Sequence, residues 1–171
     1  MRFTETPLAG AFVIELEPIV DERGFFARAW DANEFEAHGL DATIAQTNLS
    51  RTEKAGTFRG FHWQDTPHGE AKTIRCVSGA VFDVIVDMRP ESDSFRQWFG
   101  VELSSDNLKA LYVPPQFANG FLILADDTIL LYNTTKPFQL GTERGMRWDD
   151  ESLAVEWPRP VEIVSAKDAA W

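Results

Sequence analysis

The strongest constraint on the fold is a series of short segments with the polarity pattern of β-strands. Val81–Met88 alternates between two faces of an extended chain, and one face carries only large apolar side chains: Phe82, Val84, Val86 and Met88. Other segments have the character of strands: Trp98–Leu103, Leu111–Val113, Phe121–Leu124 and Ile129–Thr134. Turn-forming residues separate them, including Pro114-Pro115 and Asn119-Gly120. Short strands at this spacing predict an antiparallel β-sandwich or barrel.

Helical signals are few. Asp31 can cap a helix that contains Glu34 and ends at Gly39. A second helical turn is expected near Glu151–Val155. The predicted fold class is therefore all-β, with one or two short helices.

Composition limits the classes of function. The 171 residues are enough for one core, so we expect a single domain over residues 1–171. The net charge of −11 argues against a nucleic-acid partner, and we expect neither a membrane span nor a signal peptide. The single cysteine, Cys76, excludes an intrachain disulfide and a cysteine-based zinc cluster. The expected location is the cytoplasm.

Three side chains could carry chemistry. His62 lies in Thr57–Gln64, where it is either a hydrogen-bonded structural residue or, given its polar neighbours, an acid or base. Lys72 begins a strand-like segment, and either faces solvent or turns its charge inward to stabilise an oxyanion. Tyr132 is either a sheet aromatic with its hydroxyl at the rim or a proton donor.

The charged residues that could bind or orient a substrate give weaker signals when each is considered alone. Strict alternation places Arg59 on the face opposite to His62. Arg23 lies beside Gly24 in a tight turn, a position more typical of a surface ion pair than of an anion-binding site. Asp168, almost at the C-terminus, has the position of a solvated charge in a tail. The chain has no glycine-rich phosphate loop, dinucleotide-binding fingerprint or nucleophile elbow.

Spaced motifs run in order through nearly the whole chain. They include Asp21–Phe26, Gln46–Asn48, Phe58–Gln64, Lys72, Gly79–Val84, Val86–Arg89, Val113–Phe117, Gly120-Phe121, Leu131-Tyr132, Thr134-Thr135, Arg147–Asp149, Glu156–Pro158 and Ser165–Asp168. Together these motifs resemble the dTDP-4-dehydrorhamnose 3,5-epimerase family, whose members have a cupin-type jelly-roll fold.

The resemblance implies a cofactor-free and metal-free epimerase that acts in turn at C5 and C3 of a nucleotide-linked 4-keto-6-deoxy sugar. His62 matches the family's base, and Asp168 matches the carboxylate that orients this base. Lys72 would stabilise the enolate at C4. Tyr132 would deliver a proton from the opposite face of the sugar ring.

The resemblance also implies a binding set and a homodimer in which N-terminal segments reach the partner's site. The binding positions are Arg23, Phe26, Arg28, Gln46, Asn48, Arg59, Asn119 and Phe138. Arginine suits a diphosphate because its planar fork of donors matches phosphate oxygens. The implied partner is a small nucleotide-diphosphate sugar, with no nucleic acid or membrane.

Four positions depart from the family pattern. Asn119 stands where the family has histidine, and an amide cannot titrate near neutral pH. Arg28 replaces glutamate, Phe138 replaces tyrosine and Thr47 replaces aspartate. We expect proton transfer to be retained, while the nucleotide, the sugar or the number of inverted centres differs.

Three alternatives stay open at this point. One is a related cupin with other chemistry on a nucleotide sugar, such as ketoisomerisation, and another is a non-catalytic sugar-nucleotide binding protein. A metal-dependent cupin is disfavoured because such sites need several histidines, and His38 lies in the predicted helix while His68 lies in a Pro-Gly loop.

Overall fold

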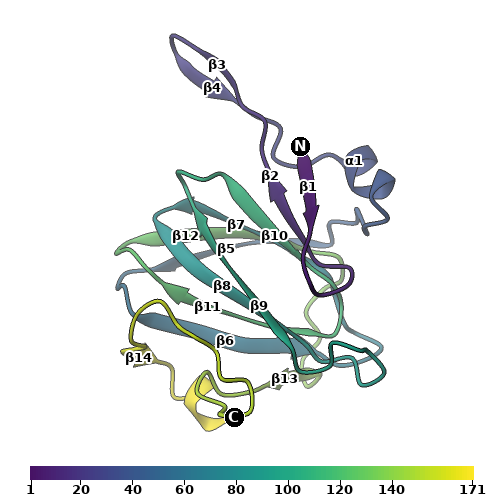
Figure 1. Cartoon of the computed structure of the whole chain (residues 1–171), viewed down its shortest axis with the longest axis vertical. Coiled ribbons are helices and arrows are strands. Elements are labelled where there is room, and N and C mark those ends of the chain that lie inside the picture. The colour runs from purple at the N-terminus through teal and green to yellow at the C-terminus, as the bar shows by residue number, and fades with distance from the viewer.

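Two six-stranded sheets pack face to face in the computed structural model, which describes residues 1–171 (Figure 1). The first sheet has the order β1 (Arg2–Glu5), β2 (Phe12–Glu15), β10 (Lys109–Val113), β7 (Lys72–Ser78), β12 (Thr128–Thr134) and β5 (Gln46–Thr52). The second has the order β13 (Glu143–Gly145), β6 (Thr57–Gln64), β11 (Phe117–Ile123), β8 (Ala80–Asp87) and β9 (Trp98–Ser104), with β14 (Ile163–Val164) also paired to β6.

The prediction of an antiparallel, all-β sandwich is confirmed. Every strand pair is antiparallel except the short parallel pair of β14 with β6. The alternation in Val81–Met88 corresponds to β8, a central strand between β11 and β9, whose two faces are covered by the first sheet and by the C-terminal segment. Ile85 points between the two sheets, whereas Val84 and Val86 face the outer layer formed by the C-terminal segment.

Buried apolar side chains form three clusters that hold the sheets and the outer segments together. Between the sheets, Ile74, Leu111 and Leu130 pack against side chains that include Ile85, and burial of this surface from water drives the association. The outer face of the second sheet is covered by residues after β13, including Met146 and Leu153. The helix α1 (Ala32–Ala37) covers the third cluster with Phe35.

The α1 helix begins where the sequence predicts. The Asp31 carboxylate accepts hydrogen bonds from the backbone N–H groups of Asn33 and Glu34, so it caps two of the free donors of the first turn. The second expected helical turn, at Glu151–Val155, is wrong: residues 151–153 form a turn only. A short 3-10 helix, η1, forms instead at Asp168–Ala170. No helix in the structure has the length and apolar character needed to cross a bilayer.

The predicted turn at Asn119-Gly120 is also wrong, because both residues lie inside β11. Gly120 is needed here for close packing, since a Cβ atom at this position would lie 2.7 Å from the Phe58 ring. Outside the sandwich, β3 (Ile19–Asp21) and β4 (Gly24–Phe26) form a hairpin that projects away from both sheets (Figure 1).

Candidate active site

Polar side chains from neighbouring strands form two rows across the inner face of the first sheet. Thr134 pairs with Gln46 on β5 and with Lys72 on β7, so these three residues form one row across the sheet. Tyr132 pairs with Asn48 on β5 and lies two residues from Thr134, which places it on the same face. The alternation of β12 therefore presents Lys72, Tyr132, Gln46 and Asn48 to the interior together.

A bulge in β6 brings Arg59 and His62 to the same side of the second sheet. His62 pairs with Asn119 and Arg59 pairs with Phe121, so three steps along β6 match two steps along β11. The extra residue in β6 shifts the alternation by one position, so the side chains beyond it lie on the opposite face from the one that strict alternation predicts. Gly60, with φ of 125°, lies within this bulge. The predicted opposite placement of Arg59 and His62 is thus wrong, and both border one cavity.

His62 is held by a buried carboxylate. Its Nε2 lies 2.7 Å from Oδ1 of Asp168, which is only 5% exposed at the start of η1. A carboxylate accepts hydrogen bonds, so this contact assigns the proton to Nε2 and leaves the lone pair on Nδ1. The remaining oxygen, Oδ2, accepts from the Gly60 backbone N–H at 3.4 Å. The arrangement leaves Nδ1 able to accept a proton.

The C-terminal segment holds Asp168 in place. The Asp168 backbone N–H donates to Ser165 Oγ at 3.0 Å, and Arg147 Nη1 donates to the Ala169 carbonyl oxygen at 2.6 Å. Trp171 packs directly on Gly145, where a Cβ atom would lie 2.2 Å from the indole. These contacts explain why a residue close to the end of the chain is buried rather than solvated.

Two adjoining cavities, of about 310 and 420 Å³, share His62, Lys72 and Tyr132. The smaller is also bordered by Gln46, Asn48, Trp63, Gln64, Glu70, Thr134, Lys136, Phe138 and Glu143. The larger is also bordered by Ser50, Thr57, Phe58, Arg59, Ile74, Asn119, Phe121, Ile163, Val164, Ser165 and Asp168. The three shared residues therefore lie at the junction of one polar and one mixed compartment.

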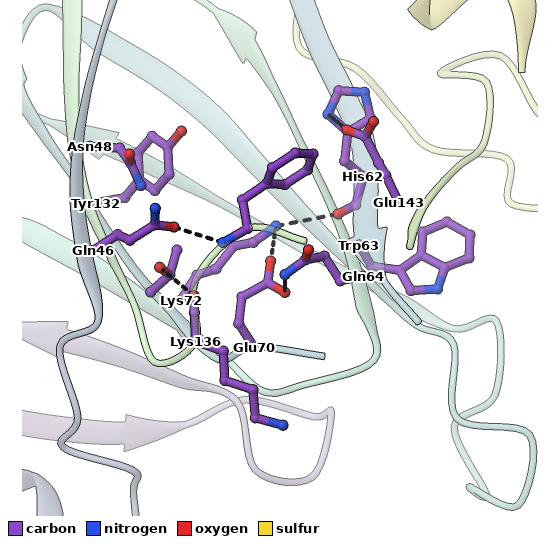
Figure 2. Close-up of a pocket in the computed structure, with 12 residues that line it drawn as sticks. Gln46, Asn48, His62, Trp63, Gln64, Glu70, Lys72, Tyr132, Lys136 and Glu143 are labelled. Atoms are coloured by element: carbon purple, nitrogen blue, oxygen red, sulfur yellow. Dashed lines mark hydrogen bonds and ion pairs between the residues drawn. The ribbon is translucent and has the colours of Figure 1, made fainter. Parts of the chain in front are cut away.

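His62 and Tyr132 approach this junction from different sheets, and Lys72 lies between them (Figure 2). Burial raises the pKa of the Tyr132 hydroxyl, an effect that the charge of Arg59 opposes, so the phenol keeps its proton at neutral pH. Lys72 carries a positive charge that is only 15% exposed. The site thus combines a proton acceptor, a proton donor and a fixed cation.

Asn119 is fixed by Asp83. Its Nδ2 donates to Asp83 Oδ1 at 2.5 Å and to the Val84 carbonyl oxygen at 3.4 Å. Because both partners are acceptors, the amide nitrogen must face them, and the amide oxygen is left toward the cavity. Asp83 is fully buried and its Oδ2 has no partner, and desolvation raises its pKa to about 7.

Three predicted binding residues lie away from the cavities. Arg23 and Phe26 are on the projecting hairpin, where Arg23 pairs with Asp21 and the Phe26 side chain is 65% exposed. Arg28 forms an exposed ion pair with Asp31 at 3.5 Å. The other predicted binding residues border a cavity: Gln46, Asn48, Arg59, Asn119 and Phe138.

The structure adds two carboxylates to which the sequence assigned no role in the site. Glu143 places Oε1 4.0 Å from His62 Nδ1 and pairs through Oε2 with Lys167. Glu70 pairs with Lys72 at 3.4 Å. Glu70 lies two residues before Lys72, a spacing that could have flagged a shared face, whereas nothing local in the sequence connects Glu143 with His62.

Comparison with known proteins agrees with this geometry. The profile of the dTDP-4-dehydrorhamnose 3,5-epimerase family matches residues 5–171. The chain is 38% identical to that enzyme from Methanothermobacter thermautotrophicus, over 99% of this chain and 92% of the relative. It is 35% identical to a dTDP-4-dehydrorhamnose 3-epimerase from Streptomyces niveus, over 98% of this chain and 81% of that one.

Among solved structures, the Bacillus anthracis dTDP-4-dehydrorhamnose 3,5-epimerase, with TDP and PPi bound, superimposes with a TM-score of 0.94. It is 38% identical, and the match covers 98% of this chain and 95% of that one. Fold, profile and identity agree over nearly the full length. The chain belongs to the dTDP-4-dehydrorhamnose 3,5-epimerase family of carbohydrate epimerases.

Proposed function

We propose that this protein epimerises a dTDP-linked 4-keto-6-deoxy sugar of the dTDP-4-dehydro-6-deoxyglucose type, through an enolate and without a cofactor. One observation carries the proposal: a histidine with a free ring nitrogen and a protonated tyrosine border the same junction from different sheets, with a lysine between them. Inversion of a carbon centre requires a proton to leave from one side of the sugar and to return from the other.

In this mechanism His62 Nδ1 removes the acidic hydrogen next to the C4 ketone. Asp168 keeps the ring oriented and stabilises the imidazolium that forms. The negative charge passes from carbon to the C4 oxygen, where the Lys72 ammonium stabilises it more strongly than it stabilises the neutral ketone. Tyr132 then gives its proton to the carbon from the opposite face.

The two compartments support a division of the substrate between sugar and nucleotide. Arg59 borders the larger cavity and Phe138 the smaller one, while Gln46 and Asn48 add neutral hydrogen-bonding groups. We infer that these residues and Asn119 bind the nucleotide-diphosphate sugar. The TDP bound by the Bacillus anthracis relative supports a thymidine nucleotide.

A second candidate is epimerisation at a single centre. Asn119 favours it, because the amide fixed by Asp83 offers a hydrogen-bond acceptor but cannot transfer a proton. The similarity to the Streptomyces niveus 3-epimerase gives this candidate a precedent among relatives. The other three departures, Arg28, Phe138 and Thr47, are all exposed, and we infer that they bear on the binding of the nucleotide rather than on proton transfer.

We further propose a homodimer in which the β3–β4 hairpin lies against the partner's site. The hairpin exposes four large apolar side chains by 57 to 73%: Ile19, Val20, Phe25 and Phe26. Such a patch on a projecting hairpin is typical of an interface. This arrangement would bring Arg23 and Phe26 to a cavity that they do not reach within one chain. Light scattering should give twice the 19.3 kDa mass of the chain.

The remaining proposals concern the whole chain. We infer one catalytic domain over residues 1–171, supported by the family match over residues 5–171. A cytoplasmic location is also proposed, and the free thiol of the buried Cys76 is compatible with a reducing compartment.

The direct test of activity is deuterium exchange, followed by NMR, with dTDP-4-dehydro-6-deoxyglucose in D2O. We expect deuterium together with inverted configuration at each epimerised centre, so that both changes at C3 and C5 identify a 3,5-epimerase and both changes at one carbon identify a single-centre enzyme. A shifted carbonyl would indicate a ketoisomerase. Binding of the sugar nucleotide without exchange would contradict the proposal and indicate a binding protein.

A further inference from the structure

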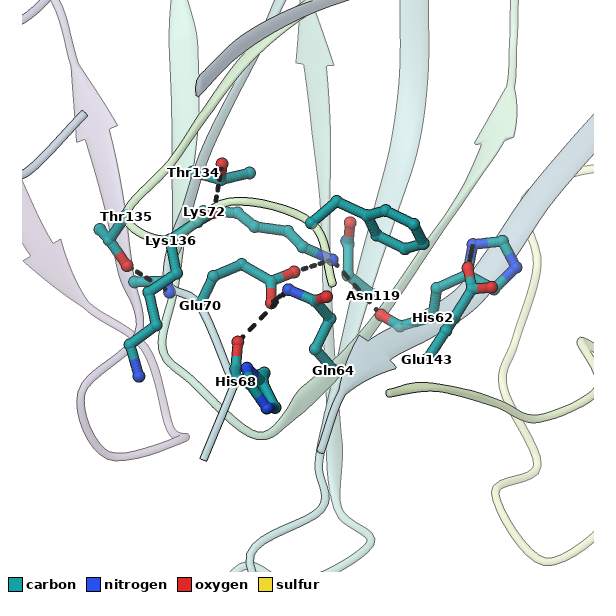
Figure 3. Close-up of polar contacts among 12 residues, drawn as sticks. His62, Gln64, His68, Glu70, Lys72, Asn119, Thr134, Thr135, Lys136 and Glu143 are labelled. Carbon is teal, nitrogen blue, oxygen red and sulfur yellow. Dashed lines mark hydrogen bonds and ion pairs between the residues drawn. The ribbon is translucent and has the colours of Figure 1, made fainter. Parts of the chain in front are cut away.

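A buried polar cluster lies beside Lys72 at the base of the smaller cavity. Its members are Gln64, which is 4% exposed at the end of β6, and Glu70, which is 9% exposed just before β7 (Figure 3). A buried carboxylate is costly unless its oxygens have partners. Each oxygen of Glu70 has one, and the two partners differ in kind.

Gln64 fixes the first oxygen of Glu70. The Gln64 amide nitrogen donates to Glu70 Oε2 at 2.7 Å. Its amide oxygen accepts from the Gln139 backbone N–H at 2.6 Å and from Thr142 Oγ1 at 3.1 Å. With donors on one side and a carboxylate on the other, the amide has only one consistent orientation. The carboxylate of Glu70 is thereby held in a set position.

The second oxygen of Glu70 faces the lysine. Glu70 Oε1 lies 3.4 Å from Lys72 Nζ, and the same ammonium donates to the backbone carbonyl oxygen of His62 at 3.4 Å. Figure 3 shows Lys72 reaching toward both oxygens. The contact with Glu70 is an ion pair, which restrains the ammonium through charge, while one N–H is held by the His62 carbonyl oxygen. The N–H groups that the His62 carbonyl oxygen does not hold are available to a ligand.

We propose that Glu70, held by Gln64, is a positioning residue that keeps the Lys72 ammonium where its free N–H groups reach the C4 oxygen of the substrate. This inference rests on the proposed epimerase function, in which Lys72 stabilises the enolate. A competing acceptor makes the positioning necessary. Asp83 has an unpartnered buried oxygen, and it lies close enough to Lys72 for that charge to lower its pKa against the effect of burial. Without Glu70, the ammonium turns toward Asp83 and away from the substrate.

A double-mutant cycle tests whether Glu70 acts through Lys72. Glu70→Gln keeps the size of the side chain and removes the charge, and should lower kcat for exchange about tenfold to a hundredfold, as a misplaced catalytic group does. KM should change less than about twofold, because the interaction is made mainly in the transition state. In a Lys72→Met background, Glu70→Gln should have no further effect, since the group that it positions is already absent.

Two further variants act as controls. Glu70→Asp keeps the charge and should recover part of the lost rate. Asp65→Asn removes an exposed carboxylate from the same loop, where it pairs with Arg144, and should leave the rate unchanged. Wild-type kcat in Glu70→Gln, or an equal loss in both backgrounds, would overturn the inference.

A crystal structure of Glu70→Gln gives a readout that does not depend on activity. We expect Lys72 Nζ to move toward Asp83 and to lose its contact with the His62 carbonyl oxygen. An unmoved Nζ would overturn the positioning role even if the wild-type protein catalysed no exchange. Absence of exchange by the wild-type protein would instead contradict the proposed function, so the two failures are distinguishable.

Discussion

Two cross-strand partners, His62 and Asn119, are each hydrogen-bonded to a buried aspartate, but of the two partners only His62 can itself accept a proton. His62 contacts Asp168 and keeps a free ring nitrogen, whereas Asn119 contacts Asp83 and offers only an amide. Imidazole changes its protonation near neutral pH and an amide does not. Similar geometry thus gives a base in one pair and a fixed hydrogen-bonding group in the other.

The difference also affects the aspartates. Asp168 accepts hydrogen bonds at both oxygens, from His62 and from the Gly60 backbone. Asp83 has a partner at one oxygen only, and its complete burial raises its pKa to about 7 despite the hydrogen bond from Asn119. The Asn119 position therefore leaves a buried acid that titrates near neutral pH, next to the cavity. The following changes make the two pairs more alike or remove one member.

The largest effect is expected when the first pair is made like the second. His62→Asn removes the proton acceptor and should reduce deuterium exchange at least about 10³-fold, near the upper range for loss of a general base. Exchange is measured by NMR under saturating sugar nucleotide. His68→Asn is the matched control, because His68 lies in the loop outside both cavities. Comparable rates in the two variants would contradict the assignment of the base.

Removal of the carboxylate from the first pair should have a smaller effect. Asp168→Asn keeps the size of the side chain but no longer stabilises the imidazolium or fixes the protonated nitrogen, so kcat should fall about 10²-fold or more. KM should change much less than kcat. Asp127→Asn, in an exposed ion pair with Arg51, serves as the control. An unchanged kcat in Asp168→Asn would show that His62 needs no carboxylate.

The reverse substitution, Asn119→His, makes the Asn119–Asp83 pair like the His62–Asp168 pair. Asn119→His places an imidazole beside Asp83, while the His62 pair is untouched, so the rate of exchange at the principal centre should stay within about fivefold of wild type. The informative quantity is the ratio of exchange at C3 to exchange at C5. A changed ratio assigns a role in the choice of centre to position 119, and a rate loss of about 10² would contradict its proposed non-acidic role.

The smallest effect on rate, with a distinct effect on stability, is expected for Asp83→Asn. Between pH 4 and 7 the folded state binds more protons than the unfolded state, because burial raises the pKa of Asp83 from 3.8 to about 7. The free energy of unfolding should therefore fall as pH rises through this range, by a few kcal/mol at most for this group.

Asp83→Asn removes this dependence. In urea unfolding, the free energy of unfolding of the variant minus that of the wild type should therefore be more positive at pH 8 than at pH 5. Parallel stability curves for the two proteins over this range would contradict the raised pKa.

Sequence patterns predicted the strands well where local physics determines them. The alternation in Val81–Met88 and the Asp31 cap depend on neighbouring residues, and both are confirmed. The bulge at Gly60 is harder to predict from sequence. One extra residue changes which face of the sheet the following side chains occupy, without any clear change in composition. The turn predicted at Asn119-Gly120 failed for a related reason, since Gly120 serves close packing inside a strand.

The site was only partly predictable from residue patterns. Lys72 and Tyr132 could be placed on strands, but their convergence with His62 depends on the packing of two sheets. Asp168 was found only through its resemblance to a family motif, since its burial comes from contacts made by Arg147 and Trp171. Glu143 reaches His62 through pairing of β13 with β6, which no local pattern indicates.

Proton transfer from opposite sides of the sugar is most directly tested with Tyr132→Phe in D2O. His62 is intact in this variant, so it should still exchange the hydrogen next to the ketone while the inverted product forms about 10²-fold more slowly than with wild type. NMR resolves deuterated substrate from deuterated epimer in one sample. Retained exchange with lost inversion is the predicted result. Inversion at the wild-type rate without the Tyr132 hydroxyl would contradict the account.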